Sequence, residues 1–245
     1  MLLFRFQTRW RFAAVVAVLF VIAAGFLTRP PPALALEGVI EVNNALVTQN
    51  GGFPFVISQS GTYRLTGSLT VTTSGVDGID VNADNVTIDL NGFAIVGSGG
   101  AAGVGIKSAN NQVTVRNGSV SGMGGDGILL GANATVTDVH AVGNGGAGIV
   151  VGNASLVTHN TVSSNTGVGI DVTGQGSTVV DNSVYNNGGY GLQLHDVSSS
   201  FAHNVFMGND GNSTVGSSAP PQVAPAASGI QVQIGSNLCN GVSCP

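Results

Sequence analysis

Basic residues are scarce in this sequence. Beyond residue 35 only three Lys or Arg residues remain, against all twelve Asp and Glu residues, so this part carries a formal charge of −9. Nucleic-acid binding needs clustered Lys and Arg to displace counterions from phosphates, and adsorption to anionic membranes needs a basic surface. The composition therefore argues against both kinds of partner. The three basic residues are Arg64, Lys107 and Arg116.

Charged residues of either sign make up only 8% of the chain. Low charge does not indicate disorder here, because disordered chains also lack large apolar side chains. In this chain apolar residues make up 43%, and Val, Ile and Leu are regularly placed. The composition therefore favours one folded domain of moderate size.

Cysteine is nearly absent, since Cys239 and Cys244 are the only two. They have no second pair of ligand residues nearby, which argues against a zinc site. In an oxidising compartment this spacing predicts a small C-terminal disulfide loop. A pair of free thiols is the alternative. We predict no metal site, no cofactor and no catalytic residue from the sequence.

The first 35 residues predict a secretory signal. Three arginines precede an uninterrupted apolar run of 16 residues, Phe12–Leu27, and residues 33–35 (Ala-Leu-Ala) form a cleavage site. The run is shorter than the roughly 20 residues that a membrane-spanning helix needs. A cleaved signal is the main prediction, and a retained membrane anchor is the alternative. Either one places the rest of the protein outside the cytoplasm, secreted or periplasmic.

A Gly-Ile-x-Val pattern recurs along the remaining chain. Its seven copies start at glycines spaced 27, 22, 21, 21, 22 and 38 residues apart. A period near 22 without a helical pattern inside it is typical of a solenoid with one coil per repeat. The copies start at Gly78, Gly105, Gly127, Gly148, Gly169, Gly191 and Gly229.

Each repeat predicts three short strands that stack in parallel on those of the next coil. In the first strand two apolar residues face inward and the residue between them faces outward, as the two-residue period of a strand requires. The predicted fold class is all-β, a parallel β-helix of about seven coils spanning 76–235. Right-handed winding is expected, because parallel crossovers take that hand. The predicted inward stack contains Ile106, Ile128, Ile149, Ile170 and Leu192.

Four coils align without gaps and reveal further columns. Val136, Val157, Val179 and Phe201 form one predicted core column. Two columns consist mainly of asparagine, whose side chain tolerates left-handed backbone and bonds to neighbouring turns. We predict that they form internal hydrogen-bonded ladders, with ligand binding as the alternative. The columns are Asn160, Asn182 and Asn204 after Val139, and Asn144, Asn165, Asn187 and Asn209.

Three further segments complete the predicted organisation. Residues 36–75 lie outside the repeat and are expected to cap the exposed sheet edge of the solenoid. The solenoid itself is expected to occupy 76–245. Within it, residues 210–228 contain Pro220, Pro221 and Pro225 and predict a loop excursion before the last Gly-Ile-Gln-Val.

The repeats at 160–172 and 182–194 resemble a known group of proteins. They are similar to the right-handed parallel β-helix repeats of the pectin-lyase-like superfamily. The likeness is to the short type in carbohydrate-binding proteins and sugar hydrolases and in the periplasmic nitrous-oxide-reductase maturation protein. The resemblance covers roughly 76–210. It implies the fold, but one fold hosts many activities.

The resemblance also implies recognisable active sites, and their motifs are absent. The chain has none of the Asn-Thr-Asp, Gly-His-Gly or Arg-Ile-Lys motifs of polygalacturonase-like enzymes, and no Asp-Pro for the alginate epimerase motif. Lyases of this group need a basic residue beside calcium-binding acids. Three basic residues are too few for a base and for the clamps on an anionic sugar.

One column combines acids and imidazoles, and we take it as a candidate surface strip. Stacked coils lie about 4.8 Å apart, so these side chains are expected to alternate along one edge. The strip would contact sugar, hold a metal or provide a general base, and a solvated turn column is the plain alternative. Its members are Asp138, His159, Asp181 and His203.

Two classes of function remain open. The first is an exported, non-catalytic β-helix that binds carbohydrate or has a structural role at the cell envelope. The second is a polysaccharide-active lyase, hydrolase or epimerase with an unfamiliar site. The scarcity of basic residues and of enzyme motifs favours the first, with polysaccharide or the envelope surface as partner.

Overall fold

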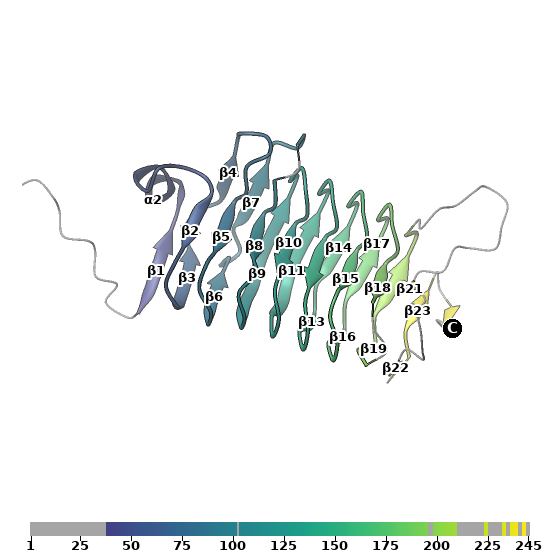
Figure 1. Cartoon of the computed structure of the whole chain (residues 1–245). Coiled ribbons are helices and arrows are strands. Elements are labelled where there is room, and N and C mark those ends of the chain that lie inside the picture. The colour runs from purple at the N-terminus through teal and green to yellow at the C-terminus, as the bar shows by residue number, and fades with distance from the viewer. Residues whose placement is uncertain are drawn as a thin grey trace, which may run out of the picture. The chain divides into compact units, whose positions relative to one another are not determined.

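The computed structural model describes residues 38–101, 103–195 and 198–209, and four short segments at 223–224, 232–233, 236–239 and 242–243. These residues form a stack of coils, seen as rows of arrows side by side in Figure 1. Each strand pairs in parallel with the equivalent strand of the next coil, and the described exception is the antiparallel pair at the C-terminal end. The predicted parallel β-helix is confirmed. Its right-handed winding stays a prediction.

The first strands of the coils form a sheet of eight strands. The structure therefore has one coil more than the sequence predicted. These strands are β2 (Phe55–Ile57), β5 (Ile79–Val81), β8 (Ile106–Ser108), β10 (Ile128–Leu130), β12 (Ile149–Val151), β15 (Ile170–Val172), β18 (Leu192–Leu194) and β21 (Val223–Ala224).

The second and third strands of the coils belong to one sheet of 16 strands. In two coils they are continuous, as β9 (Val113–Ser121) and β11 (Thr135–Val142). Elsewhere the second strands are β3 (Gly61–Leu65), β6 (Val86–Asp89), β13 (Leu156–Thr158), β16 (Thr178–Val180), β19 (Ser200–Ala202) and β22 (Val232–Gln233). The third strands are β4 (Leu69–Val71), β7 (Ala94–Gly97), β14 (Thr161–Ser163), β17 (Ser183–Tyr185), β20 (Val205–Met207) and β23 (Leu238–Cys239).

The N-terminal region differs from the predicted cap. Strands β2, β3 and β4 pair in register with β5, β6 and β7, so the predicted cap contains a complete coil. This coil was missed because Pro54 stands before its first strand, where six other coils have glycine. The end itself is formed by β1 (Val39–Val42), which pairs with β3, and by the short helix α2 (Asn44–Gln49). The Asn43 side chain caps the helix by accepting a hydrogen bond from the Leu46 N–H.

The C-terminal end also differs from the prediction. The last first strand is Val223–Ala224, which lies within the predicted excursion 210–228 and pairs with β18. Val232, predicted to belong to a first strand, pairs instead with Ser200 of the second strand β19. The Gly-Ile-Gln-Val match at 229–232 was misleading. The first strand of this coil is already formed by Val223–Ala224, so Val232 belongs to the second strand. β24 (Val242–Ser243) pairs with β23 at the end.

The core consists of inward-facing columns that run along the stack. The predicted column from Ile106 to Leu192 is confirmed, since its five members pair in register and are 0% exposed. The column from Val136 to Phe201 is likewise buried. Burial of apolar side chains in successive coils is the main stabilising contribution in this fold.

Both asparagine ladders are confirmed and buried. The Asn182 Oδ1 accepts from the backbone N–H and the Nδ2 of Asn160, and the Asn182 Nδ2 donates to the Val157 carbonyl and to Asn204. The second ladder repeats this pattern from Asn144 to Asn209. These side chains satisfy backbone groups that the turns leave unpaired inside the protein.

A serine ladder, which the sequence analysis did not identify, borders the second strands. Ser155 and Ser177 are buried, and their hydroxyls accept the backbone N–H groups of Ala134 and Ser155 in the preceding coils. Ser199 continues this arrangement by accepting from the Ser177 N–H. Three polar ladders therefore hold successive coils in one register.

Candidate functional site

The predicted strip lies at the bend between the second and third strands of each coil. Its members have left-handed backbone, with φ of 55° at Asp138, 56° at His159, 57° at Asp181 and 55° at His203. Asn, Asp and His are the non-glycine residues most enriched in this conformation. The bend by itself therefore explains why these residue types occur here.

The side chains of the strip are exposed and contact one another. The His159 Nε2 lies 4.0 Å from one oxygen of Asp181, and the His203 Nδ1 lies 3.6 Å from the other. Exposed fractions are 62% for His159, 43% for Asp181 and 63% for His203. The structure thus brings three members together around one carboxylate, on an open edge. Asp138, also exposed, accepts a hydrogen bond of 2.9 Å from the Thr137 hydroxyl instead.

A second group of titratable side chains lies on the outward face of the first strands. The Lys107 Nζ lies 3.2 Å from the Asp77 Oδ2, and Asp80 pairs in register with Lys107. The Asp80 Oδ1 is buried without a hydrogen-bond partner among the described residues. Burial raises the pKa of the Asp80 carboxyl above its ordinary value, and the neighbouring Asp77 acts in the same direction.

Four coils further along the same face, Asp171 and His195 form a close pair. The His195 Nε2 lies 2.9 Å from the Asp171 Oδ1. Burial raises the pKa of the Asp171 carboxyl, while the nearby imidazole opposes that shift. The sequence analysis did not identify this contact, because the two residues are 24 positions apart and belong to successive coils.

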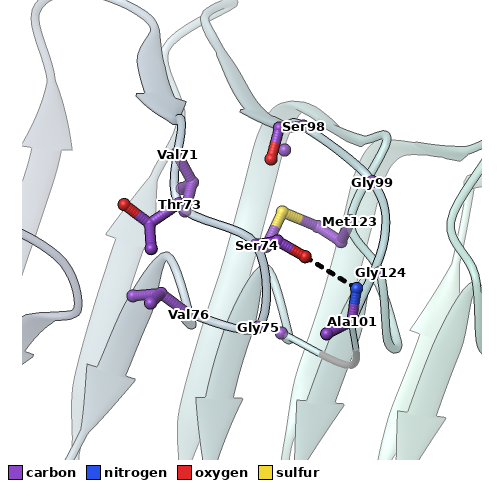
Figure 2. A pocket seen from close by; sticks show the side chains of 12 residues that line it. Val71, Thr73, Ser74, Gly75, Val76, Ser98, Gly99, Ala101, Met123 and Gly124 are labelled. Carbon is purple, nitrogen blue, oxygen red and sulfur yellow. Dashed lines mark hydrogen bonds between the residues drawn. The ribbon is translucent and has the colours of Figure 1, made fainter.

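Between these groups the first-strand face is apolar. Leu129 and Val150 occupy the outward positions, and Val150 is only 7% exposed. A small hollow elsewhere, between turns that precede the first strands, is lined by Val71, Ser74 and Met123 among others (Figure 2). The Ser74 hydroxyl accepts from the Ala101 N–H there, and the lining has no charged side chain. This hollow offers no acid or base for chemistry.

Every Lys and Arg in the described part of the chain is ion-paired. Besides the Lys107–Asp77 pair, Arg116 lies 3.1 Å from Asp89, and Arg64 lies 3.6 Å from Glu41. Described carboxylates outnumber these cations. No unpaired cation therefore faces a ligand from the described surface.

The sequence matches the model of a family described as "Periplasmic copper-binding protein (NosD)" over residues 39–222. The chain belongs to the NosD family. The family is periplasmic by its description, which supports the predicted location outside the cytoplasm. No helix within the described ranges is long and apolar enough to cross a membrane, and residues 1–35 lie outside those ranges. No curated protein and no solved structure matches the chain significantly.

The NosD description names copper, and the described residues do not fit a preformed copper site. No group of three or more His, Cys, Asp or Glu side chains among them is arranged to hold a metal ion. His159 and His203 lie within 4.0 Å of Asp181, but all three side chains are substantially exposed to solvent. Cys239 is buried and disulfide-bonded, so it offers no thiolate. Its predicted partner Cys244 lies outside the described residues, and their pairing stays a prediction.

Proposed function

We propose that this NosD-family protein is an exported, non-catalytic module that binds carbohydrate through its surface. The observation that carries the proposal is the arrangement of the strip. Asp138, His159, Asp181 and His203 alternate along one column, and their side chains are exposed to solvent. Most glycoside hydrolases use a pair of carboxyl groups that flank the scissile bond, and the strip does not enclose such a bond between two carboxyl groups. An exposed row of acceptors and imidazoles suits hydrogen bonding to sugar hydroxyls.

The test is a panel of polysaccharides scored for both binding and cleavage. Purified exported protein should bind at least one neutral polysaccharide in affinity electrophoresis or calorimetry. It should release no reducing ends and no unsaturated products from pectate, alginate or neutral glucans. Absence of binding throughout the panel would reject the carbohydrate proposal, and a surface-structural role would remain.

The Asp171–His195 pair favours a second candidate, a polysaccharide-active enzyme. A carboxyl whose pKa burial has raised, in contact with an imidazole, is the one partly buried acid–base pair that we find on the described surface. If this candidate is correct, cleavage products appear in the same panel and Asp171→Asn abolishes them. Asp181→Asn tests the strip in the same way. Cleavage sensitive to either change would replace the non-catalytic proposal.

A further inference from the structure

We infer that the glycan contact surface is the outward face of the second strands, and that it takes an uncharged polysaccharide chain lying along the solenoid axis. This inference rests on the proposed carbohydrate binding and names its site and ligand class. The face, called here the second-strand face, consists of the outward side chains of β3, β6, β13, β16 and β19 and of the first halves of β9 and β11. The strip borders it.

One column of the second-strand face is rich in hydroxyl groups over seven consecutive coils. Its seven members there pair in register, and six of them are Thr or Ser. Valine occupies the same position beyond each end, at Val39 in β1 and at Val232 in β22. The exception is a leucine that is 37% exposed. The column consists of Thr62, Thr87, Thr114, Thr135, Leu156, Thr178 and Ser200.

Packing holds these hydroxyls in regular positions. Thr135 lies between Ala134 and Val136, which are buried, so its own side chain points outward. Threonine has a restricted χ1 angle, and successive strands lie about 4.8 Å apart. The hydroxyls of Thr114 and Thr135 make no hydrogen bond to any described side chain or backbone group. The Thr178 hydroxyl lies 3.4 Å from the Ser200 hydroxyl. Preordered donors and acceptors lose little entropy when they bind a ligand.

The second column of this face is uncharged from β11 to β19. Thr137, Thr158, Val180 and Ala202 follow one another there in register. The first three are partly exposed, whereas Ala202 is only 3% exposed. Thr137 donates to Asp138, and the Thr158 hydroxyl lies 2.8 Å from the His159 Nδ1, so the face and the strip are continuous. The accessible uncharged patch is therefore three coils long, about 10 Å at the usual strand spacing.

Charge selects the class of polysaccharide. Arg64 and Arg116 lie in the preceding coils of the same column, and their ion pairs leave no unpaired cation for a uronate or sulfate group. The excess of carboxylates on the whole molecule would repel an anionic polymer at low salt. Because the hydroxyls repeat along the axis, a polymer of repeating hydroxyl groups makes the most contacts when it lies parallel to that axis.

The test removes two hydroxyls and keeps the shape of the face. The double variant Thr135→Val with Thr178→Val, made in the full exported protein, should bind a neutral β-glucan or mannan roughly tenfold more weakly. This is the loss expected when about two hydrogen bonds to the ligand are removed. Thr161→Val is the matched control, since Thr161 is an outward-facing threonine of the third strand β14. It should leave binding unchanged. Circular dichroism and melting establish that each variant is folded.

The possible outcomes separate this inference from the proposed function. If both variants still bind neutral glycan, the second-strand face is not the contact surface, although the proposed carbohydrate binding stands. Binding only to pectate or alginate would overturn the uncharged ligand class. No binding to any polysaccharide would overturn both. Self-association in sedimentation that the double variant abolishes, without glycan binding, would identify a second copy of the chain as the occupant.

Discussion

Asparagine side chains act as hydrogen-bonding partners of the backbone at two turns of this protein. Asn182 is 1% exposed, and its amide links three successive coils. A side chain in this position replaces the water that a surface turn would use. The ladders therefore explain a large part of the asparagine content without any ligand.

Asn182→Ala should lower the free energy of unfolding by about 1–3 kcal/mol. The change leaves the Val157 carbonyl and the Asn160 N–H without their partners inside the protein. Chemical denaturation measures the effect. Asn111→Ala, at an exposed turn, is the control and should have little effect. A neutral result for Asn182→Ala would contradict the structural role of the ladder.

Asp80→Asn should stabilise the protein near pH 7, by roughly 0.5 kcal/mol after allowance for solvent screening. Burial and Asp77 raise the Asp80 pKa in the folded state. Stability from a raised pKa is fully present below the unfolded value of about 3.9 and is lost as pH rises through the folded pKa. Asparagine avoids that loss, so its advantage should shrink as the pH falls towards 4.

The measurement for Asp80 is a set of denaturation curves from pH 4 to pH 7. Asp138→Asn removes a carboxylate that is exposed and serves as the control. If Asp80→Asn destabilises at pH 7, the electrostatic attraction of Lys107 for the Asp80 carboxylate outweighs the cost of burying its charge.

At the scale of elements, the bend between second and third strands decides the character of the strip. In β11 the strand continues through the bend, with Asp138 in left-handed conformation. The same conformation recurs in the next three coils. Asp and His are favoured at this bend because they tolerate left-handed backbone. The bend also places their polar groups beside the second-strand face. A structural role in the bend is therefore compatible with the proposed contact to a ligand.

Asp138→Val should destabilise the fold by about 1–2 kcal/mol, because a β-branched residue is strained at positive φ. Asp138→Asn should be neutral within about 0.5 kcal/mol, since asparagine tolerates this conformation. Melting temperatures of the two variants measure the difference. Equal stability of both would show that the bend relaxes and that the backbone does not select the residue type.

At the scale of the whole molecule, in-register stacking converts one local pattern into extended surfaces. The strip, the second-strand face and the first-strand face each repeat a side-chain position from coil to coil. The net charge of the molecule is negative, and this disfavours the binding of anionic partners to any of these surfaces at low ionic strength. Regular, mostly uncharged faces are consistent with a polymeric ligand.

The exported protein should contain no free thiol. Cys239 is disulfide-bonded, and Cys244 is the remaining cysteine of the sequence. Periplasmic and secreted compartments keep such pairs oxidised. Thiol titration of denatured, non-reduced protein checks this, with a reduced sample as the control. Two titratable thiols would show that the protein matures in a reducing compartment.

The periodic features could be predicted from the sequence because they depend on local rules. Alternation within a strand assigns inward and outward positions, and a constant repeat aligns them between coils. The Ile149 stack, the Val157 column and the Asn182 ladder follow from these rules alone. Both departures from the prediction are at the ends, where Pro54 and residues 229–232 break the relation between motif and strand.

Only the tertiary structure decided which side chains meet across coils. The contacts of His195 with Asp171 and of Lys107 with Asp77 join residues 24 and 30 positions apart, and irregular turn lengths hide such pairs from the sequence. The hydroxyl column likewise exists only once register places Thr114 beside Thr135. The sequence by itself determined the coil and its core, since hydrophobic period is local. The proposed contact surface depends on the register between coils, which backbone pairing and the polar ladders establish.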